Sequence, residues 1–150
     1  MKRASLSVLI ITLLLSCQAK GQDGFHKLKS IHSIDETVGK LSNVLKAKGM
    51  TIFSVIDHQQ GALAVDMELR RTTLVIFGSP KVGTKLMQCD QRVGYALPLK
   101  MLIWQDDAGI IWLGYRDPSK LKTEYDLESC SETIEKVKSA MSNFATAATS

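Results

Sequence analysis

The feature that most constrains the fold is a β-hairpin near residue 107. Two apolar segments, 99–105 and 110–115, flank the short polar connection Asp106-Asp107-Ala108-Gly109. The length and composition of this connection are typical of a hairpin, so the two strands are predicted to run antiparallel. A sheet that contains such a pair, in a chain that also has helical crossovers, favours an α+β fold.

Three more segments have strand character: 25–31, 51–57 and 72–77. The segment 51–57 is apolar on both faces, so we expect it inside the sheet rather than at an edge. The segment 72–77 is a β-branched run that stops at Gly78-Ser79-Pro80. The sequence therefore predicts a sheet of four to five strands.

Helices are predicted between these strands. Ser33 and Glu36 form a capping box that begins the first helix, and Gly49 ends it. A short helix is expected within 58–67, another over 81–89, and a further short one from Asp117-Pro118. The last helix begins near residue 129 or 131 and is expected to fray from Ala145. The residues expected to face the core from these helices are Ile34, Val38, Leu41, Leu45, Val82, Leu86, Cys89, Ile134, Val137, Met141 and Phe144.

This order of elements predicts an α+β fold of two layers, with the helices packed on one face of a mainly antiparallel sheet. With 45% hydrophobic and 23% charged residues, the composition excludes collagen-like and disordered chains. A length of 150 residues favours one domain. We expect that domain over 25–145, after a leader over 1–17 and a glycine-rich tether over 18–24.

The first 17 residues have the pattern of a signal peptide. Lys2 and Arg3 precede an apolar run over 6–15, which is far shorter than the ~20 residues that cross a bilayer. The segment Leu14-Leu15-Ser16-Cys17 resembles the lipobox of bacterial lipoproteins, in which the cysteine becomes the lipidated N-terminus. The alternative is simple secretion after signal-peptide cleavage that follows Gly21.

Lipidation of Cys17 would anchor the protein in a membrane and place it in the cell envelope, facing the periplasm. Gln18 stands where the inner-membrane retention signal of Gram-negative lipoproteins has aspartate. By that resemblance, the outer membrane is favoured over the inner one. Without lipidation, the protein is expected to be periplasmic or secreted.

The charge gives no indication of nucleic-acid binding. The chain has 19 basic and 15 acidic residues, for a net charge of +4, and two of the basic residues, Lys2 and Arg3, lie in the leader. Residues 18–150 therefore carry 17 basic and 15 acidic groups, or +2. So small an excess is no basis for predicting a nucleic-acid partner.

Two cysteines, Cys89 and Cys130, remain after the leader. In an oxidising compartment they could form a disulfide, and the alternative is two separate, buried thiols. The sequence has no CxxC pair, and its histidines, His26, His32 and His58, have no zinc-site spacing. We therefore expect neither a metal nor a cofactor.

A candidate polar site consists of His58, Lys81, Lys100 and Tyr115. His58 follows a strand and could be a general acid/base, a metal ligand or an ordinary loop residue. Lys100 interrupts an otherwise apolar strand, where an unpaired buried charge would be costly.

A candidate anion-binding loop joins the strand 72–77 to the next helix. Its residues are Gly78, Ser79, Lys81, Gly83 and Thr84. The loop is not a P-loop, because threonine rather than lysine follows its second glycine. Free backbone amides at a helix N-terminus could still hold an anion. The alternative is a plain turn followed by a helix cap.

A larger pattern covers 49–127 and about half of the chain. The residues that carry it are Gly49, Asp57-His58, Thr73-Leu74-Val75-Ile76-Phe77-Gly78, Pro80-Lys81, Gly83-Thr84, Leu86-Met87-Gln88, Leu97-Pro98-Leu99-Lys100, Leu102-Ile103-Trp104, Gly109, Trp112 and Tyr115-Arg116-Asp117-Pro118. In these residues the chain resembles the domain of unknown function 302 family. The resemblance implies a small α+β domain that can pair as a homodimer, and it implies no established activity. Cys89-Asp90-Gln91 replaces the small residue and asparagine-proline pair usual in the family, so Cys89 is a poor candidate for shared family chemistry.

Three functions remain open from the sequence. The first is a non-catalytic ligand-binding or interaction module in the envelope. The second is an envelope enzyme that uses His58 as acid/base and binds an anionic substrate through Lys81 or Lys100. The third is redox or metal handling through Cys89 and Cys130.

Overall fold

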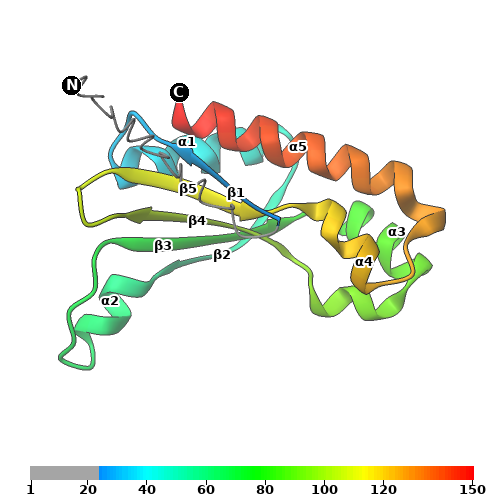
Figure 1. The fold of residues 1–150 in the computed structure, drawn as a ribbon, viewed down its shortest axis with the longest axis horizontal. Helices are drawn as coiled ribbons and strands as arrows, with labels where there is room; N and C mark the ends of the chain where they lie inside the picture. Colours follow the sequence, from blue (N-terminus) through cyan, green and yellow to red (C-terminus); the bar gives the residue numbers. More distant parts are fainter. Residues whose placement is uncertain (1–23) are drawn as a thin grey trace, which may run out of the picture.

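The computed structural model describes residues 24–150 (Figure 1). The leader, Cys17 and the tether up to residue 23 lie outside the described residues. The strands within 24–150 are β1 (Phe25–Lys29), β2 (Thr51–Asp57), β3 (Thr72–Gly78), β4 (Leu99–Gln105) and β5 (Ile111–Arg116). The helices are α1 (Ile34–Ala47), α2 (His58–Leu63), α3 (Pro80–Cys89), α4 (Leu121–Glu124) and α5 (Ser131–Thr149), with 3₁₀ turns η1 (Gln91–Tyr95), η2 (Pro118–Lys120) and η3 (Glu128–Cys130).

The five strands form one sheet in the order β1-β5-β4-β3-β2. Every neighbouring pair is antiparallel. The predicted hairpin is present as β4–β5, with Trp104 opposite Trp112. The α+β fold is confirmed.

The position of β2 was predicted wrongly. We expected an internal strand because its apolar residues occupy both faces, yet β2 lies at the edge of the sheet and pairs only with β3. Phe53 and Val55 are about half exposed. Its two-sided apolar character therefore does not reflect burial.

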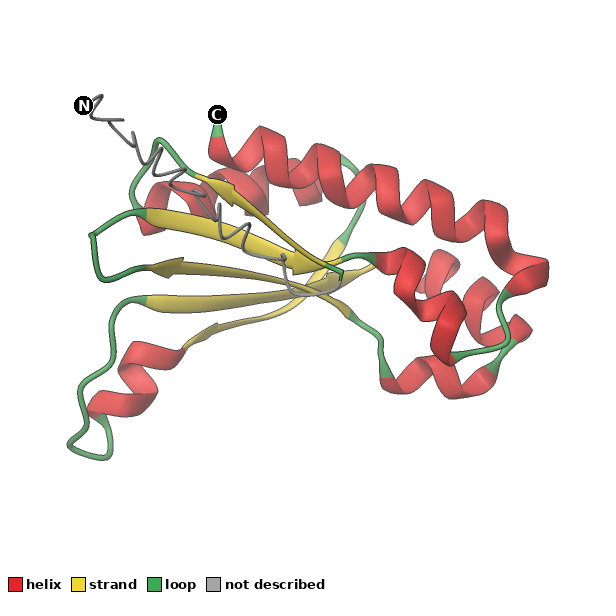
Figure 2. Ribbon diagram, in the orientation of Figure 1, coloured by secondary structure: helices red, strands yellow, loops and turns green. Residues whose placement is uncertain are grey.

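The long helices α1 and α5 cover one face of the sheet (Figures 1 and 2). Alternate strand residues turn toward these helices and are buried, and the side chains between them lie on the other face. The strand residues of the main core are Val75, Phe77, Met101, Ile103, Leu113 and Tyr115. Trp104 and Trp112 are half-buried on the other face.

Helix α1 begins as predicted. The Ser33 hydroxyl accepts a hydrogen bond from the Glu36 amide at 3.3 Å, and the Glu36 carboxylate accepts one from the Ser33 amide at 3.0 Å. This reciprocal pair is the capping box, and it satisfies two amides that the helix itself leaves without partners.

We expected the end of α5 to fray from Ala145, but the helix continues to Thr149. Ala145 and Ala148 are fully buried in the main core, and the Thr149 carbonyl accepts a hydrogen bond from the Ile31 amide at 3.1 Å. Packing against the start of α1 therefore holds the last turn, and the ordered domain continues past residue 145.

A second, smaller core closes one end of the sheet, where α3, η1, α4 and η3 gather (Figure 1). Its buried residues are Leu86, Val93, Leu121, Leu127, Cys130 and Ile134. Helix α2 lies at the opposite end and projects from the sheet (Figure 1). His58 lies at the end with α2, whereas Lys81 lies at the end with α3.

Candidate functional site

The predicted polar site is not assembled. His58 follows the end of β2 that pairs with Thr73, at the start of β3, whereas Lys81 follows the end of β3. A seven-residue strand is about 20 Å long, so β3 separates the two side chains by roughly its full length. His58 cannot act on a group held by Lys81.

Lys100 and Tyr115 line a shared cavity at the end of the sheet where β4 begins and β5 ends. Lys100 is exposed, and its Nζ donates a hydrogen bond to the Pro98 carbonyl at 2.9 Å, just before the start of β4, so its charge is not buried. Tyr115 is buried on the helix-covered face, and burial raises the pKa of its phenol. Strand alternation sends the two side chains to opposite faces of the sheet.

The predicted anion-binding loop does join β3 to α3, but its residues are divided between two cavities. Gly78, Ser79, Gly83 and Thr84 line one cavity, and Lys81 lines its neighbour, to which Ser79 also contributes. The lysine therefore contributes no charge to the cavity that the rest of the loop forms.

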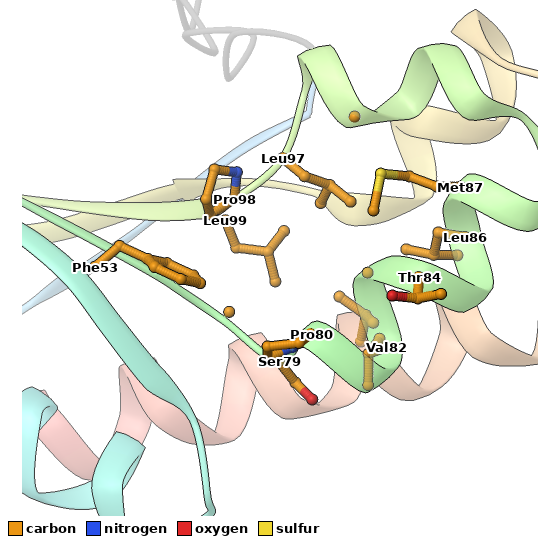
Figure 3. A pocket seen from close by; sticks show the side chains of 14 residues that line it. Phe53, Ser79, Pro80, Val82, Thr84, Leu86, Met87, Leu97, Pro98 and Leu99 are labelled. Carbon is orange, nitrogen blue, oxygen red and sulfur yellow. The ribbon is translucent and has the colours of Figure 1, made fainter.

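The first cavity is lined by residues of α3, and we call it the α3 cavity. Its volume is about 340 Å³, and it lies between α3, the segment before β4 and the edge strand β2 (Figure 3). The side chains around it are almost all apolar: Phe53, Pro80, Val82, Leu86, Met87, Leu97, Pro98, Leu99 and Val137. Ser79 points its hydroxyl away from this ring, and Thr84 turns its hydroxyl toward the enclosed space (Figure 3).

Local sequence explains why a space remains here. Pro80 begins α3 in the first turn, where a proline costs no hydrogen bond. Gly83 then presents no side chain to the cavity, and a Cβ placed there would lie 3.7 Å from Leu97. The Leu97–Pro98 peptide is cis and leads the chain past the cavity into β4.

Cys89 and Cys130 form a disulfide, with their Cα atoms 6.4 Å apart. The alternative of two separate thiols is therefore wrong. The bond joins the end of α3 to η3, and both residues belong to the second core. Cys130 is 8% exposed, and Cys89 is half-buried.

Asp90 is a buried carboxylate that the sequence analysis missed. It forms a bidentate ion pair with the guanidinium of Arg92, at 3.0 and 2.7 Å, and accepts the Asp126 amide at 3.0 Å. The Arg92 hydrogen bonds hold the pKa of Asp90 well below its usual range. The Asp-x-Arg spacing was the available signal, and the role of Asp90 is to tie the α3–η1 connection to the segment after α4.

Within residues 24–150, no three histidine, cysteine or acidic side chains come together to hold a metal ion. Over the same residues, no helix combines the length and the hydrophobicity needed to span a bilayer.

The profile of the family described as "Domain of unknown function DUF302" matches residues 26–144. The chain belongs to the DUF302 family. The match confirms the resemblance drawn from 49–127 and extends it over both flanking segments.

Curated relatives of this DUF302 chain include two proteins named "Fluoride-specific ion channel FluC 1". The one from Brucella suis biovar 1 (strain 1330) is 38% identical over 104 residues, which is 69% of this chain and 41% of the relative. The one from Brucella abortus biovar 1 (strain 9-941) is also 38% identical over 104 residues and is covered over 38% of its length. The chain thus spans about two fifths of the relatives that it matches.

Among solved structures, the fold is similar to the "Crystal structure of uncharacterized conserved protein DUF302 from Bacillus stearothermophilus". The TM-score is 0.77 at 15% identity, and the alignment covers 85% of this chain and 99% of that one. This likeness shows the shared fold. Since almost the whole of that chain is aligned, a chain made of this domain alone folds.

Proposed function

We propose that this DUF302 domain is a non-catalytic binding module that takes a small, uncharged, apolar ligand in the α3 cavity. The observation that carries the proposal is an apolar cavity of about 340 Å³ with no charged side chain among the described residues that line it. Ligand sites in proteins typically occupy about 300–1,000 Å³ and are mostly apolar, with a few polar groups that orient the ligand. In the α3 cavity the Thr84 hydroxyl is placed to serve that purpose.

The acid/base alternative has less support. General acid/base catalysis requires the proton-transferring group within hydrogen-bond reach of the substrate, and the substrate would also have to be held by lysine. His58 lies at one end of β3, and Lys81 and Lys100 lie toward the other. A single small anion cannot contact both ends of the sheet.

The redox alternative is also weaker than a structural role for the disulfide. Exchange with a partner thiol requires access to a sulfur atom. Cys130 is buried and Cys89 half-buried, and both pack within the second core. We assign a structural role to the disulfide: it stabilises the second core and, with it, one side of the α3 cavity.

We place the module in the bacterial envelope, anchored through a lipid on Cys17. The disulfide supports this location, because such bonds persist in oxidising compartments and are rare in the cytosol. The lipobox-like leader supports it independently. The relatives named as ion channels support a place for such a domain at a membrane. We do not propose fluoride transport for this chain.

The binding proposal is tested with an uncharged fluorescent probe, N-phenyl-1-naphthylamine, and residues 24–150. We expect saturable binding that Gly83→Leu weakens by roughly tenfold or more, because a leucine side chain would fill the space beside Leu97. Gly39→Leu is the matched control, since Gly39 is also inside a helix and nothing lies within 4 Å of its Cβ position. Equal binding by both variants would refute the assignment of the site.

The anchor is tested by metabolic labelling of the full chain with a clickable palmitate analogue. We expect label on the wild-type chain and none on Cys17→Ser. Ser16→Ala, which keeps a small residue before the cysteine, should retain the label. Unlabelled wild-type protein in the soluble periplasmic fraction would support simple secretion instead.

A further inference from the structure

The sheet face opposite α1 and α5 is only partly buried, and we call it the open face. Figure 2 shows the two long helices on one side of the sheet. Directly paired residues of antiparallel strands share a face, so the register places the side chains of all five strands. The open face carries the side chains of Phe25, Lys27, Lys29, Lys100, Trp104, Trp112 and Arg116, with aliphatic residues between them.

Two tryptophans belong to the open face. Trp104 and Trp112 lie directly opposite each other on β4 and β5, and both are half-buried. Phe25 packs against Trp104, with the ring centroids 6.3 Å apart. Both rings pack over Gly114, because a Cβ there would lie 2.6 Å from the Phe25 ring and 2.9 Å from the Trp104 ring. The Trp112 Nε1 donates a hydrogen bond to the Asp106 carboxylate at 2.8 Å. Aromatic surface is therefore held in place close to the backbone of β5.

The charged side chains that the strands place on the open face are all basic. Lys27 and Lys29 come from β1, Lys100 from β4 and Arg116 from β5, and all four are exposed. Arg116 pairs with Glu124 of α4. None of the three lysines forms an ion pair with an acidic side chain of residues 24–150. The open face therefore has positive charge that the described chain leaves uncompensated.

Tryptophan beside lysine is a combination that suits the boundary between lipid and water. Tryptophan rings are enriched at the level of the lipid headgroups, and basic side chains are attracted to anionic lipids. A lysine can also lay its methylene chain along an apolar surface while its ammonium group reaches the headgroups. Here the Lys27 ammonium lies 4.5 Å from the centroid of the Trp112 ring, so cation and ring are already side by side.

We propose that the open face docks this domain onto an anionic phospholipid surface. Trp104 and Trp112 then lie at the level of the headgroups, and Lys27, Lys29 and Lys100 contact the lipid phosphates. The charge complementarity between an uncompensated basic face and an anionic surface carries this choice of partner.

The length of the tether supports the same partner, and this part of the argument rests on the lipid anchor proposed above. Cys17 lies eight residues before Phe25, so the extended chain between them spans at most about 28 Å. Phe25 itself belongs to the open face. A lipid on Cys17 therefore keeps the open face close to the membrane, where even weak docking is favoured by the high local concentration.

The test is co-sedimentation of residues 24–150 with vesicles of equimolar phosphatidylglycerol and phosphatidylcholine. We expect binding to these vesicles and none to phosphatidylcholine alone. Lys27→Gln/Lys29→Gln should weaken partitioning by roughly fivefold for each lysine near the anionic surface, and so by roughly 30-fold for the pair. Lys46→Gln/Lys48→Gln is the matched control, because it removes the same charge at the same spacing from the end of α1, on the covered side of the sheet.

The two tryptophans give a second readout, because they are the only ones in the chain and both belong to the open face. Brominated phosphatidylcholine in the mixed vesicles should quench their fluorescence in the wild type. Circular dichroism establishes that each variant is folded. Because residues 24–150 lack Cys17, the vesicle result does not depend on whether the anchor is present.

Four results would overturn the proposal. The first is no binding to the mixed vesicles at low salt. The second is an equal loss of binding in the two double variants, which would indicate attraction by net charge alone. The third is binding without tryptophan quenching, which would place the contact on another surface. Aromatic side chains on a sheet can also stack with bases, so the fourth is binding to single-stranded DNA without binding to the vesicles.

Discussion

Reduction of the Cys89–Cys130 disulfide should cost a large part of the stability of this domain. The bond closes a loop with a sequence separation of 41 residues, which contains η1, β4, β5, η2, α4 and most of η3. In the unfolded chain, an intact bond excludes the many conformations in which the ends of this loop lie apart. For a loop of this length, the chain-entropy model gives about 4 kcal/mol at 25 °C.

That magnitude is large compared with the whole free energy of unfolding, which for natural domains is about 5–15 kcal/mol. The folded state should suffer little by comparison, because the second core keeps its apolar contacts through Leu86, Val93 and Leu127 after reduction. With a urea m-value of about 1.5 kcal/mol per M, a loss of this size lowers the unfolding midpoint by roughly 2–3 M.

The assay is urea unfolding of residues 24–150 with and without dithiothreitol, followed by tryptophan fluorescence. Cys89 and Cys130 are the only cysteines in this segment, so reduction changes one bond. The Cys89→Ser/Cys130→Ser variant should unfold at the midpoint of the reduced wild type, and dithiothreitol should not shift it further.

Two results would refute the reasoning. Thiol titration of the unreduced, denatured protein that finds two free cysteines would show that the bond does not form. A midpoint unchanged by reduction would show that the loop is already constrained in the unfolded chain, so that the chain-entropy estimate does not apply here.

Three further perturbations test other parts of the structure. Ser33→Ala removes the cap of α1 and should lower the free energy of unfolding by about 1 kcal/mol, measured by urea unfolding. Phe77→Ala leaves a cavity in the fully buried main core and should cost about 3–5 kcal/mol, with little or no folded protein as the extreme outcome. The pKa of Asp90 is lowered in the folded state, so its stabilising effect is present above the unfolded value near 3.8 and is lost as the pH falls through the folded value. The melting temperature should therefore fall on acidification, and the part of that fall due to Asp90 should be absent in Asp90→Asn; an identical acid profile in both proteins would contradict this role.

Local signals in the sequence predicted most of the secondary structure. The hairpin connection at Asp106–Gly109 and the capping box at Ser33 and Glu36 were both confirmed. Each depends on residues only a few positions apart, so the sequence contains the whole interaction. The turn η1 was not predicted, although its cap is also local: the Asp90 carboxylate accepts a hydrogen bond from the Arg92 amide, two positions on.

The order of strands was not accessible in the same way. A two-sided apolar strand such as β2 is normally internal, and only the pairing with β3 places it at an edge. Edge and centre differ by which distant segments pair, and loop-closure entropy and packing of the entire chain decide that choice. The candidate polar site was predicted wrongly for the same reason. His58 and Lys81 both have basic side chains, but they lie near opposite ends of β3.

The sequence alone determined the fold class, the helix starts, the hairpin and membership of the DUF302 family, because these follow from local patterns and their order along the chain. The tertiary structure alone decided which residues share a cavity, which strands lie at the edges of the sheet and which cysteines meet. These properties depend on contacts between residues far apart in the chain. Burial and proximity arise only when the sheet, the two long helices and the second core are packed together.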